Sequence, residues 1–294
     1  MSRRVEGIIV KAYGGFYFVS DNRNTWRCTL RGVFKHRKID VLVGDRVAAV
    51  VDEFGGGVVE EVYPRRNALI RPPVANVDRA VIVFAVMEPD PSALLLDRFL
   101  VHVRCEDIEP VICINKMDLW RGKAVEIYDV YTSAGYRVIL TSTVDKTGIE
   151  DLRRVLEKGV SVFAGPSGVG KSSLLNAVKP GLSLKTGEVG GKLKRGRHTT
   201  RNVELLFLGQ DGLVADTPGF TSLYLPEIKK EDLAMYFPDM ENYIYSCRFN
   251  GCIHWTEPDC AVKTAVDKNM IDRGRYARYL EILKEVMERE RIHR

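Results

Sequence analysis

Gly165-Pro166-Ser167-Gly168-Val169-Gly170-Lys171-Ser172 is the stretch that decides the fold of this 294-residue chain. It follows the apolar run Val160–Ala164 and precedes a segment that we expect to be helical from about Ser173. A strand, a glycine-rich loop ending in Lys-Ser and a helix together form a phosphate-binding loop, in which backbone N–H groups face the phosphates. We therefore expect every residue from Gly165 to Ser173 to bind nucleotide. Lys171 is also a catalytic candidate because it reaches the β- and γ-phosphates, and Ser172 is expected to bind Mg²⁺.

A second candidate motif is Asp216-Thr217-Pro218-Gly219, directly after the apolar residues Leu213–Ala215. Taken alone it also fits an ordinary turn, but beside a phosphate loop it predicts a magnesium and γ-phosphate site. Asp216 is expected to hold Mg²⁺ through a water or another ligand, and the Gly219 amide to contact the γ-phosphate. The next residue is Phe220, where many small GTPases have a glutamine that orients the attacking water. Hydrolysis is therefore expected to be intrinsically slow or to use another group.

A third motif, Asn115-Lys116-Met117-Asp118, follows the apolar run Val111–Ile114. The Asp118 carboxylate can accept hydrogen bonds from N1–H and the exocyclic amine of guanine, an arrangement that adenine does not offer. Asn115 is expected to support the loop and the Lys116 stem to cover the base. The motif predicts a site for GTP and GDP. Thr141-Ser142-Thr143 either supplies further backbone contacts to the base or forms an ordinary polar loop.

The glycine-rich, basic segment Lys185–Arg201 lies between the phosphate loop and Asp216. Thr199 or Thr200 is expected to coordinate Mg²⁺ in the GTP state, and Thr200 is the candidate we carry forward. His198 beside them is a candidate for orienting the attacking water. It is equally readable as a surface histidine that contacts nucleic acid.

Four potential metal ligands cluster within 14 residues near the C-terminus: Cys247, Cys252, His254 and Cys260. Three thiolates and one imidazole match a closed tetrahedral zinc site, with no position left for a reactive water. We expect one structural Zn²⁺ per chain, because the segment has little apolar content with which to fold alone. The other three cysteines read as small core residues.

Three regions of different character divide the chain. Residues 1–72 contain short strand-like stretches separated by turn residues, which predicts a small β-barrel of the OB-fold type. Arg71-Pro72-Pro73 reads as a semi-rigid linker. Residues 73–226 carry uninterrupted apolar runs with helical segments between them, typical of a doubly wound α/β domain. Residues 227–294 combine the cysteine–histidine loop with helices, over Ile228–Tyr236 and again over Ala261–Ile292.

The charge is concentrated at the N-terminus. Residues 1–76 hold 13 Lys and Arg against 8 Asp and Glu. The difference of +5 equals the net charge of the whole chain. Such a basic segment predicts either a nucleic-acid partner or a solvated charged face. No apolar run reaches the ~20 residues that span a bilayer, and no signal-like segment begins the chain, so we expect a cytoplasmic protein without membrane contact. Absence of heptads favours a monomer.

The motifs occur in a permuted order, since the guanine motif precedes the phosphate loop and Asp216–Gly219 comes last. In this order the chain resembles the RsgA (YjeQ/YloQ) family of circularly permuted GTPases. The resemblance covers the basic barrel, NKMD at Asn115–Asp118, GPSGVGKSS at Gly165–Ser173, GRHTT at Gly196–Thr200, DTPGF at Asp216–Phe220 and the cysteine cluster. It implies an OB-fold, a permuted GTPase domain and a zinc-binding C-terminal domain.

The resemblance also implies a function: GTP hydrolysis to GDP and phosphate, stimulated by the small ribosomal subunit, during late maturation of that subunit and with contact to its rRNA. Because of Phe220, a second hypothesis stays open, an RNA-binding module that nucleotide regulates with little turnover. A third is a permuted GTPase that serves the large subunit or another RNA. From the permuted order we further expect the γ-phosphate contacts to reposition the C-terminal domain, because the chain runs directly from Gly219 into it.

Overall fold

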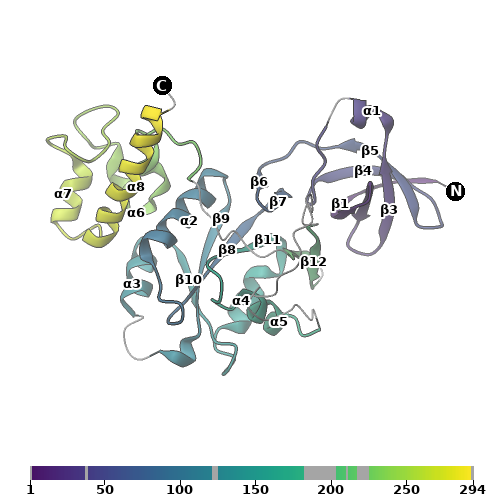
Figure 1. The fold of residues 1–294 in the computed structure, drawn as a ribbon, viewed down its shortest axis with the longest axis horizontal. Helices are drawn as coiled ribbons and strands as arrows, with labels where there is room; N and C mark the ends of the chain where they lie inside the picture. The colour runs from purple at the N-terminus through teal and green to yellow at the C-terminus, as the bar shows by residue number, and fades with distance from the viewer. Residues whose placement is uncertain are drawn as a thin grey trace.

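The computed structural model describes residues 2–36, 39–120, 125–181, 203–209, 211–216 and 225–292. Figure 1 shows three parts side by side: a small barrel that contains the N-terminus, a central α/β part, and a helical part that contains the C-terminus. Within the described residues, no helix combines the length and the apolar character needed to traverse a bilayer.

The N-terminal part is a closed barrel with strand order β1-β2-β3-β5-β4. Its strands are β1 (Arg3–Tyr13), β2 (Phe16–Ser20), β3 (Thr25–Leu30), β4 (Arg46–Val51) and β5 (Gly56–Val62). All pairings are antiparallel except β3 with β5. Closure leaves no open sheet edge. The expected small β-barrel is confirmed, and a short helix, α1 (Gly32–His36), adds to it.

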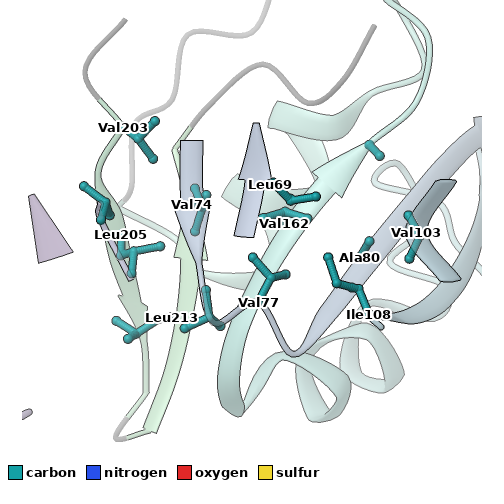
Figure 2. Packing of buried hydrophobic residues seen from close by; sticks show 14 of the residues in the cluster. Leu69, Val74, Val77, Ala80, Val103, Ile108, Val162, Val203, Leu205 and Leu213 are labelled. Carbon is teal, nitrogen blue, oxygen red and sulfur yellow. The ribbon is translucent and has the colours of Figure 1, made fainter. Parts of the chain in front are cut away.

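The segment expected to be a linker is a β-hairpin instead. β6 (Ala68–Ile70) pairs with β7 (Pro73–Ala75), and Arg71 and Pro72 form the turn. Pro73 is tolerated because it is the first residue of its strand. Leu69 and Val74 are buried, and Figure 2 shows them against the sheet face that carries Val162 and Leu213. The hairpin therefore packs between barrel and sheet.

The central part is a six-stranded sheet with the order β10-β9-β8-β11-β13-β12. Its strands are β8 (Arg79–Ala85), β9 (Glu109–Asn115), β10 (Arg137–Leu140), β11 (Lys158–Ala164), β12 (Leu205–Leu208) and β13 (Asp211–Ala215). Only β12 runs antiparallel to its neighbour. The apolar runs became parallel strands because both faces of the sheet are covered.

The two faces of the sheet belong to different cores. Along β8, Ile82 and Phe84 pack in a cluster with residues of α2 (Ala93–Cys105), α3 (Val125–Ser133) and the barrel. The alternate residues Val81 and Val83 pack instead with residues of α4 (Ile149–Leu156) and α5 (Lys171–Val178). Because side chains alternate along a strand, one strand serves both cores, as expected for a doubly wound domain.

The C-terminal part contains a 3₁₀ helix η2 (Leu233–Tyr236) and the helices α6 (Pro238–Ile244), α7 (Ala261–Asp267) and α8 (Arg273–Ile292). Two expectations are wrong here. The helix expected over Ile228–Tyr236 is only the short 3₁₀ turn, and α6 follows it. The helix expected over Ala261–Ile292 is two helices, because Asn269 adopts a left-handed φ of 57° and the Asp272 side chain caps α8 at the Arg275 amide, 2.7 Å away.

A buried charge cluster joins α8 to the central part. The Arg275 side chain, 1% exposed, donates to Asp97 of α2 (2.5 Å) and Asp239 of α6 (2.9 Å). It also donates to the Tyr136 hydroxyl at 3.0 Å. Arg278 shares Asp97, at 2.5 Å. The C-terminal part is therefore docked on the helix that follows β8.

Candidate nucleotide site and metal centre

The phosphate loop connects β11 to α5. Gly165 has a φ of 129°, and a Cβ atom there would lie 2.1 Å from the Val83 carbonyl oxygen, so the position requires glycine. Lys171 begins α5 and its Nζ donates to the carbonyls of Gly165 (2.8 Å) and Pro166 (2.6 Å). Burial lowers the pKa of Lys171. Ser172 lies beside it in the first turn of α5, with Ser173 next.

The guanine motif follows β9, on the same edge of the sheet. Lys116 has a left-handed φ of 64°, and residues Met117–Leu119 form a 3₁₀ turn. The Ser142 hydroxyl donates to Asp118 Oδ1 at 2.6 Å and accepts from the Val144 amide at 3.1 Å. The carboxylate of Asp118 is thereby held in one orientation.

Asn115 connects the two loops. Its Nδ2 donates to the Val169 carbonyl in the phosphate loop at 2.8 Å, and its Oδ1 accepts from Thr141 Oγ1 at 3.1 Å. A Cβ atom on Gly170 would lie 2.5 Å from the same Nδ2. Both hydrogen bonds of the Asn115 side chain are buried, and a buried hydrogen bond is costly to lose. The sequence motifs 50 residues apart are therefore brought together as one site.

The Thr141-Ser142 pair is more than a polar loop, because both residues are fully buried and each orients a residue of the guanine motif. These side-chain roles were missed from the sequence. Their only signal was the position of two hydroxyl residues directly after an apolar run.

Asp216 lies directly after β13. Its backbone N–H donates to the Glu204 carbonyl at 2.7 Å. Burial, and to a lesser extent the Glu204 carboxylate, raises the pKa of Asp216. The other candidates of this region lie outside the described residues: Thr217, Pro218, Gly219, Phe220 and the segment Lys185–Arg201 with His198, Thr199 and Thr200.

The cysteine–histidine cluster is assembled. One ligand atom from each of the four residues lies within 4.8 Å of all the others: Cys247, Cys252, His254 and Cys260. His254 Nδ1 is 3.5 Å from Cys247 Sγ and 3.4 Å from Cys260 Sγ. Burial lowers the pKa of His254, which favours the neutral imidazole that metals bind. The geometry and donor set of the cluster suggest a metal site.

The backbone around the cluster is fixed by its neighbours. The Glu257 carboxylate accepts from the amides of Ile253 and Trp255, both at 2.9 Å. From α8, Tyr276 donates to the His254 carbonyl at 2.7 Å and Tyr279 to the Ile253 carbonyl at 2.9 Å. These contacts hold His254 in a left-handed conformation with a φ of 59°. The metal site is thus supported by the same helix that carries Arg275.

Comparison with known proteins identifies the family. Residues 62–226 match the family described as RsgA GTPase, and residues 6–59 match the RsgA N-terminal domain. The chain belongs to the RsgA GTPase family. It is therefore a GTPase, and the expected order of barrel, permuted α/β domain and cysteine–histidine region is that of RsgA proteins.

Relatives of similar length support the assignment. The small ribosomal subunit biogenesis GTPase RsgA of Moorella thermoacetica is 49% identical over 287 residues, with 98% of this chain and 99% of that protein covered. The one from Caldanaerobacter subterraneus is 48% identical over 289 residues, with 98% of each covered. Among solved RsgA structures, YjeQ from Thermotoga maritima aligns with a TM-score of 0.87 at 38% identity, covering 97% of this chain and 99% of that one. YloQ, a circularly permuted GTPase, aligns at 0.84 and 42%, covering 98% and 96%.

Proposed function

We propose that this GTPase hydrolyses GTP to GDP and phosphate on the small ribosomal subunit and assists the late maturation of that subunit. The observation that carries the proposal is the Asn115–Val169 contact, because it joins a guanine-reading loop to a phosphate loop at one edge of the sheet. The relatives named as small ribosomal subunit biogenesis GTPases support the choice of partner. Residues 1–72, 73–226 and 227–294 would act as RNA-binding, GTPase and zinc-binding domains.

In this proposal the two loops divide the nucleotide between them. Residues Asn115–Asp118 bind guanine, with Asp118 accepting from the base, and residues Gly165–Ser173 bind the phosphates. When bound, Mg²⁺ would neutralise the negative charge that develops on the β- and γ-phosphate oxygens. Ser172, Asp216 and one of Thr199 and Thr200 would hold it, and the Gly219 amide would contact the γ-phosphate.

Water activation is assigned to His198, since the side chain of Phe220 has no polar atom that could orient a water. Lys171 would stabilise the charge on the leaving GDP, and Thr200 would complete the site. A group from the ribosomal subunit would stimulate the reaction by completing the catalytic site.

The barrel is proposed as the rRNA-binding domain. Its basic charge favours a polyanion. Exposed aromatic and basic side chains occur together at the β1–β2 turn, where Tyr13 and Phe16 are exposed and Arg27 lies over the Phe16 ring at 4.8 Å. Such rings stack on unpaired bases.

Zinc is proposed for the metal site, with one structural ion bound by Cys247, Cys252, His254 and Cys260. All four positions would be taken by protein, so the ion would hold the loop and not react. Burial raises the pKa of Cys252 and Cys260, so the ion would have to displace their protons on binding and would then stabilise the thiolates.

The test is GTP turnover by the full chain with and without purified small subunits. The expected result is a rate that rises with subunit concentration and saturates. A rate that stays unchanged at saturating subunits would refute activation by this partner. Large subunits serve as the comparison, and stimulation by them alone would favour the large subunit as the partner.

His198→Ala distinguishes the enzyme from a nucleotide-regulated RNA-binding module. If His198 orients the water, the variant should bind GTP normally and fail to cleave it on the subunit. If the chain is such a module, subunit binding and release should be the same as for the unaltered chain. Lys171→Ala, which should abolish nucleotide binding in either case, is the control.

A further inference from the structure

The barrel contacts the β12–β13 hairpin at two points. Close to the nucleotide site, Lys11 Nζ of β1 lies 2.6 Å from Glu204 Oε2, and the two residues also form an antiparallel backbone bridge. At the other end of the hairpin, Asn22 Nδ2 in the β2–β3 turn donates to Asp211 Oδ1 at 3.3 Å. These two contacts hold the barrel against both ends of the β12–β13 hairpin.

Glu204 makes contacts in two directions. Its side chain meets Lys11 of the barrel, and its carbonyl accepts the amide of Asp216 at 2.7 Å. In the chain, Glu204 comes three residues after Arg201, the last residue of the basic segment. Glu204 therefore contacts both the barrel and Asp216 of the proposed nucleotide site.

The hairpin is suited to carry a displacement because it is packed on both strands. Leu205 pairs with Ala215 and Leu208 with Gly212. Val203, Leu205 and Leu213 are buried in the cluster that includes barrel residues, and Figure 2 shows them along the two strands beside the β6–β7 hairpin. A close-packed element moves as a unit when one end is shifted.

We infer that Lys11 and Glu204 are positioning residues that couple RNA contact by the barrel to nucleotide binding at Asp216. The inference rests on the function proposed above. Coupling between two binding sites is reciprocal, so GTP should favour the barrel orientation that binds the subunit, and the subunit should favour bound GTP by the same factor.

The size of the effect follows from the exposure of the pair. The side chains of Lys11 and Glu204 are 38% and 40% exposed. A partly screened ion pair of this kind changes an equilibrium by about 1.4-fold to fivefold. The coupling between the two binding sites should therefore fall only a few-fold. To detect so small a change, the affinities with GTP and with GDP must be measured on the same protein preparation and compared as a ratio.

The experiment measures the dissociation constant of the full chain from small subunits with GDP and with a non-hydrolysable GTP analogue, by co-sedimentation. Lys11→Met and Glu204→Gln are compared with Arg4→Met. Arg4 is the matched control because it lies on the same strand as Lys11 and its replacement removes the same charge, while its partner, Glu61 at 2.8 Å, belongs to β5 of the barrel and not to the β12–β13 hairpin. Thermal unfolding verifies that each variant is folded.

Both coupling variants should lower the GTP-to-GDP affinity ratio by about 1.4-fold to fivefold, and the double variant should lower it no further, because the two residues form one contact. Arg4→Met should weaken binding in both nucleotide states equally and leave the ratio unchanged. A ratio for Lys11→Met and Glu204→Gln equal to that of the unaltered chain would overturn the inference. If the unaltered chain itself shows no nucleotide-dependent subunit binding, the proposed function fails instead.

Discussion

The buried Arg275 cluster permits a quantitative prediction. Arg275→Met keeps most of the apolar stem but removes the positive charge that pairs with Asp97 and Asp239. The side chains of these two aspartates are 0% and 7% exposed. Removing one partner of a buried ion pair leaves the other charge uncompensated and costs about 3–5 kcal/mol. The free energy of unfolding of the C-terminal part should fall by that amount, because Asp239 would keep no ion-pair partner among the described residues, whereas Asp97 would keep Arg278.

The assay is urea unfolding followed by the fluorescence of Trp255, which lies in the cysteine–histidine loop. Trp26 and Trp120 are replaced by phenylalanine in all samples, so only the C-terminal part is observed. Arg273→Met is the matched control, because Arg273 lies on the same helix and is exposed. The Arg273→Met substitution should change the free energy of unfolding by no more than about 0.5 kcal/mol.

The reasoning would be refuted by an Arg275→Met variant whose unfolding free energy differs from that of Arg273→Met by less than about 1 kcal/mol, a quarter or so of the cost of an uncompensated buried charge. Such a result would mean that Asp97 is sufficiently paired by Arg278, which lies 2.5 Å away.

Three further predictions concern the two sites. Ser142→Ala should raise the dissociation constant for GDP about tenfold or more, because a hydrogen bond to the Asp118 carboxylate is lost. Thr143→Ala, the control, should leave this constant unchanged, and isothermal titration calorimetry measures both variants. Gly165→Ala should abolish nucleotide binding through the clash with the Val83 carbonyl, and Gly32→Ala, where a Cβ meets nothing within 4 Å, should leave the dissociation constant unchanged. Cys252→Ser should reduce bound zinc below one per chain by atomic emission spectroscopy, with Cys105→Ser retaining it; equal zinc in both would remove Cys252 from the ligand set.

Much of the fold could be predicted from local signals. Turn residues separate the barrel strands, and the apolar runs Val111–Ile114 and Val160–Ala164 correspond to the buried parallel strands β9 and β11. Both the barrel and the α/β sheet could therefore be expected. The signals are local because a strand buried on both faces needs apolar residues at every position.

The C-terminal part was less predictable because its helices depend on single capping residues. Asn269 and Asp272 end one helix and begin the next, although the apolar spacing continues through both. The linker expectation failed for a related reason: proline restricts its own φ but does not determine whether Leu69 finds a partner strand.

The candidate site was predictable as motifs and not as contacts. Asn115 and Val169 were each expected to bind nucleotide, but their mutual hydrogen bond depends on the adjacency of strands β9, β8 and β11. Arg275 and Asp97 are 178 residues apart, and no periodicity links them. If γ-phosphate contacts reposition the C-terminal domain as expected from the permuted order, the Arg275–Asp97 ion pair would have to break.

The order of the central sheet has a consequence for folding. Strands β8, β9 and β10 come from residues 79–140, and β11, β12 and β13 come from residues 158–215, so each half of the sheet is continuous in the chain. Among the described strands, the two halves pair with each other only through β8 and β11. The base-reading loop belongs to the first half and the phosphate loop to the second. A guanine nucleotide that contacts both loops would therefore bridge two consecutive segments of the chain, and its binding would stabilise their association.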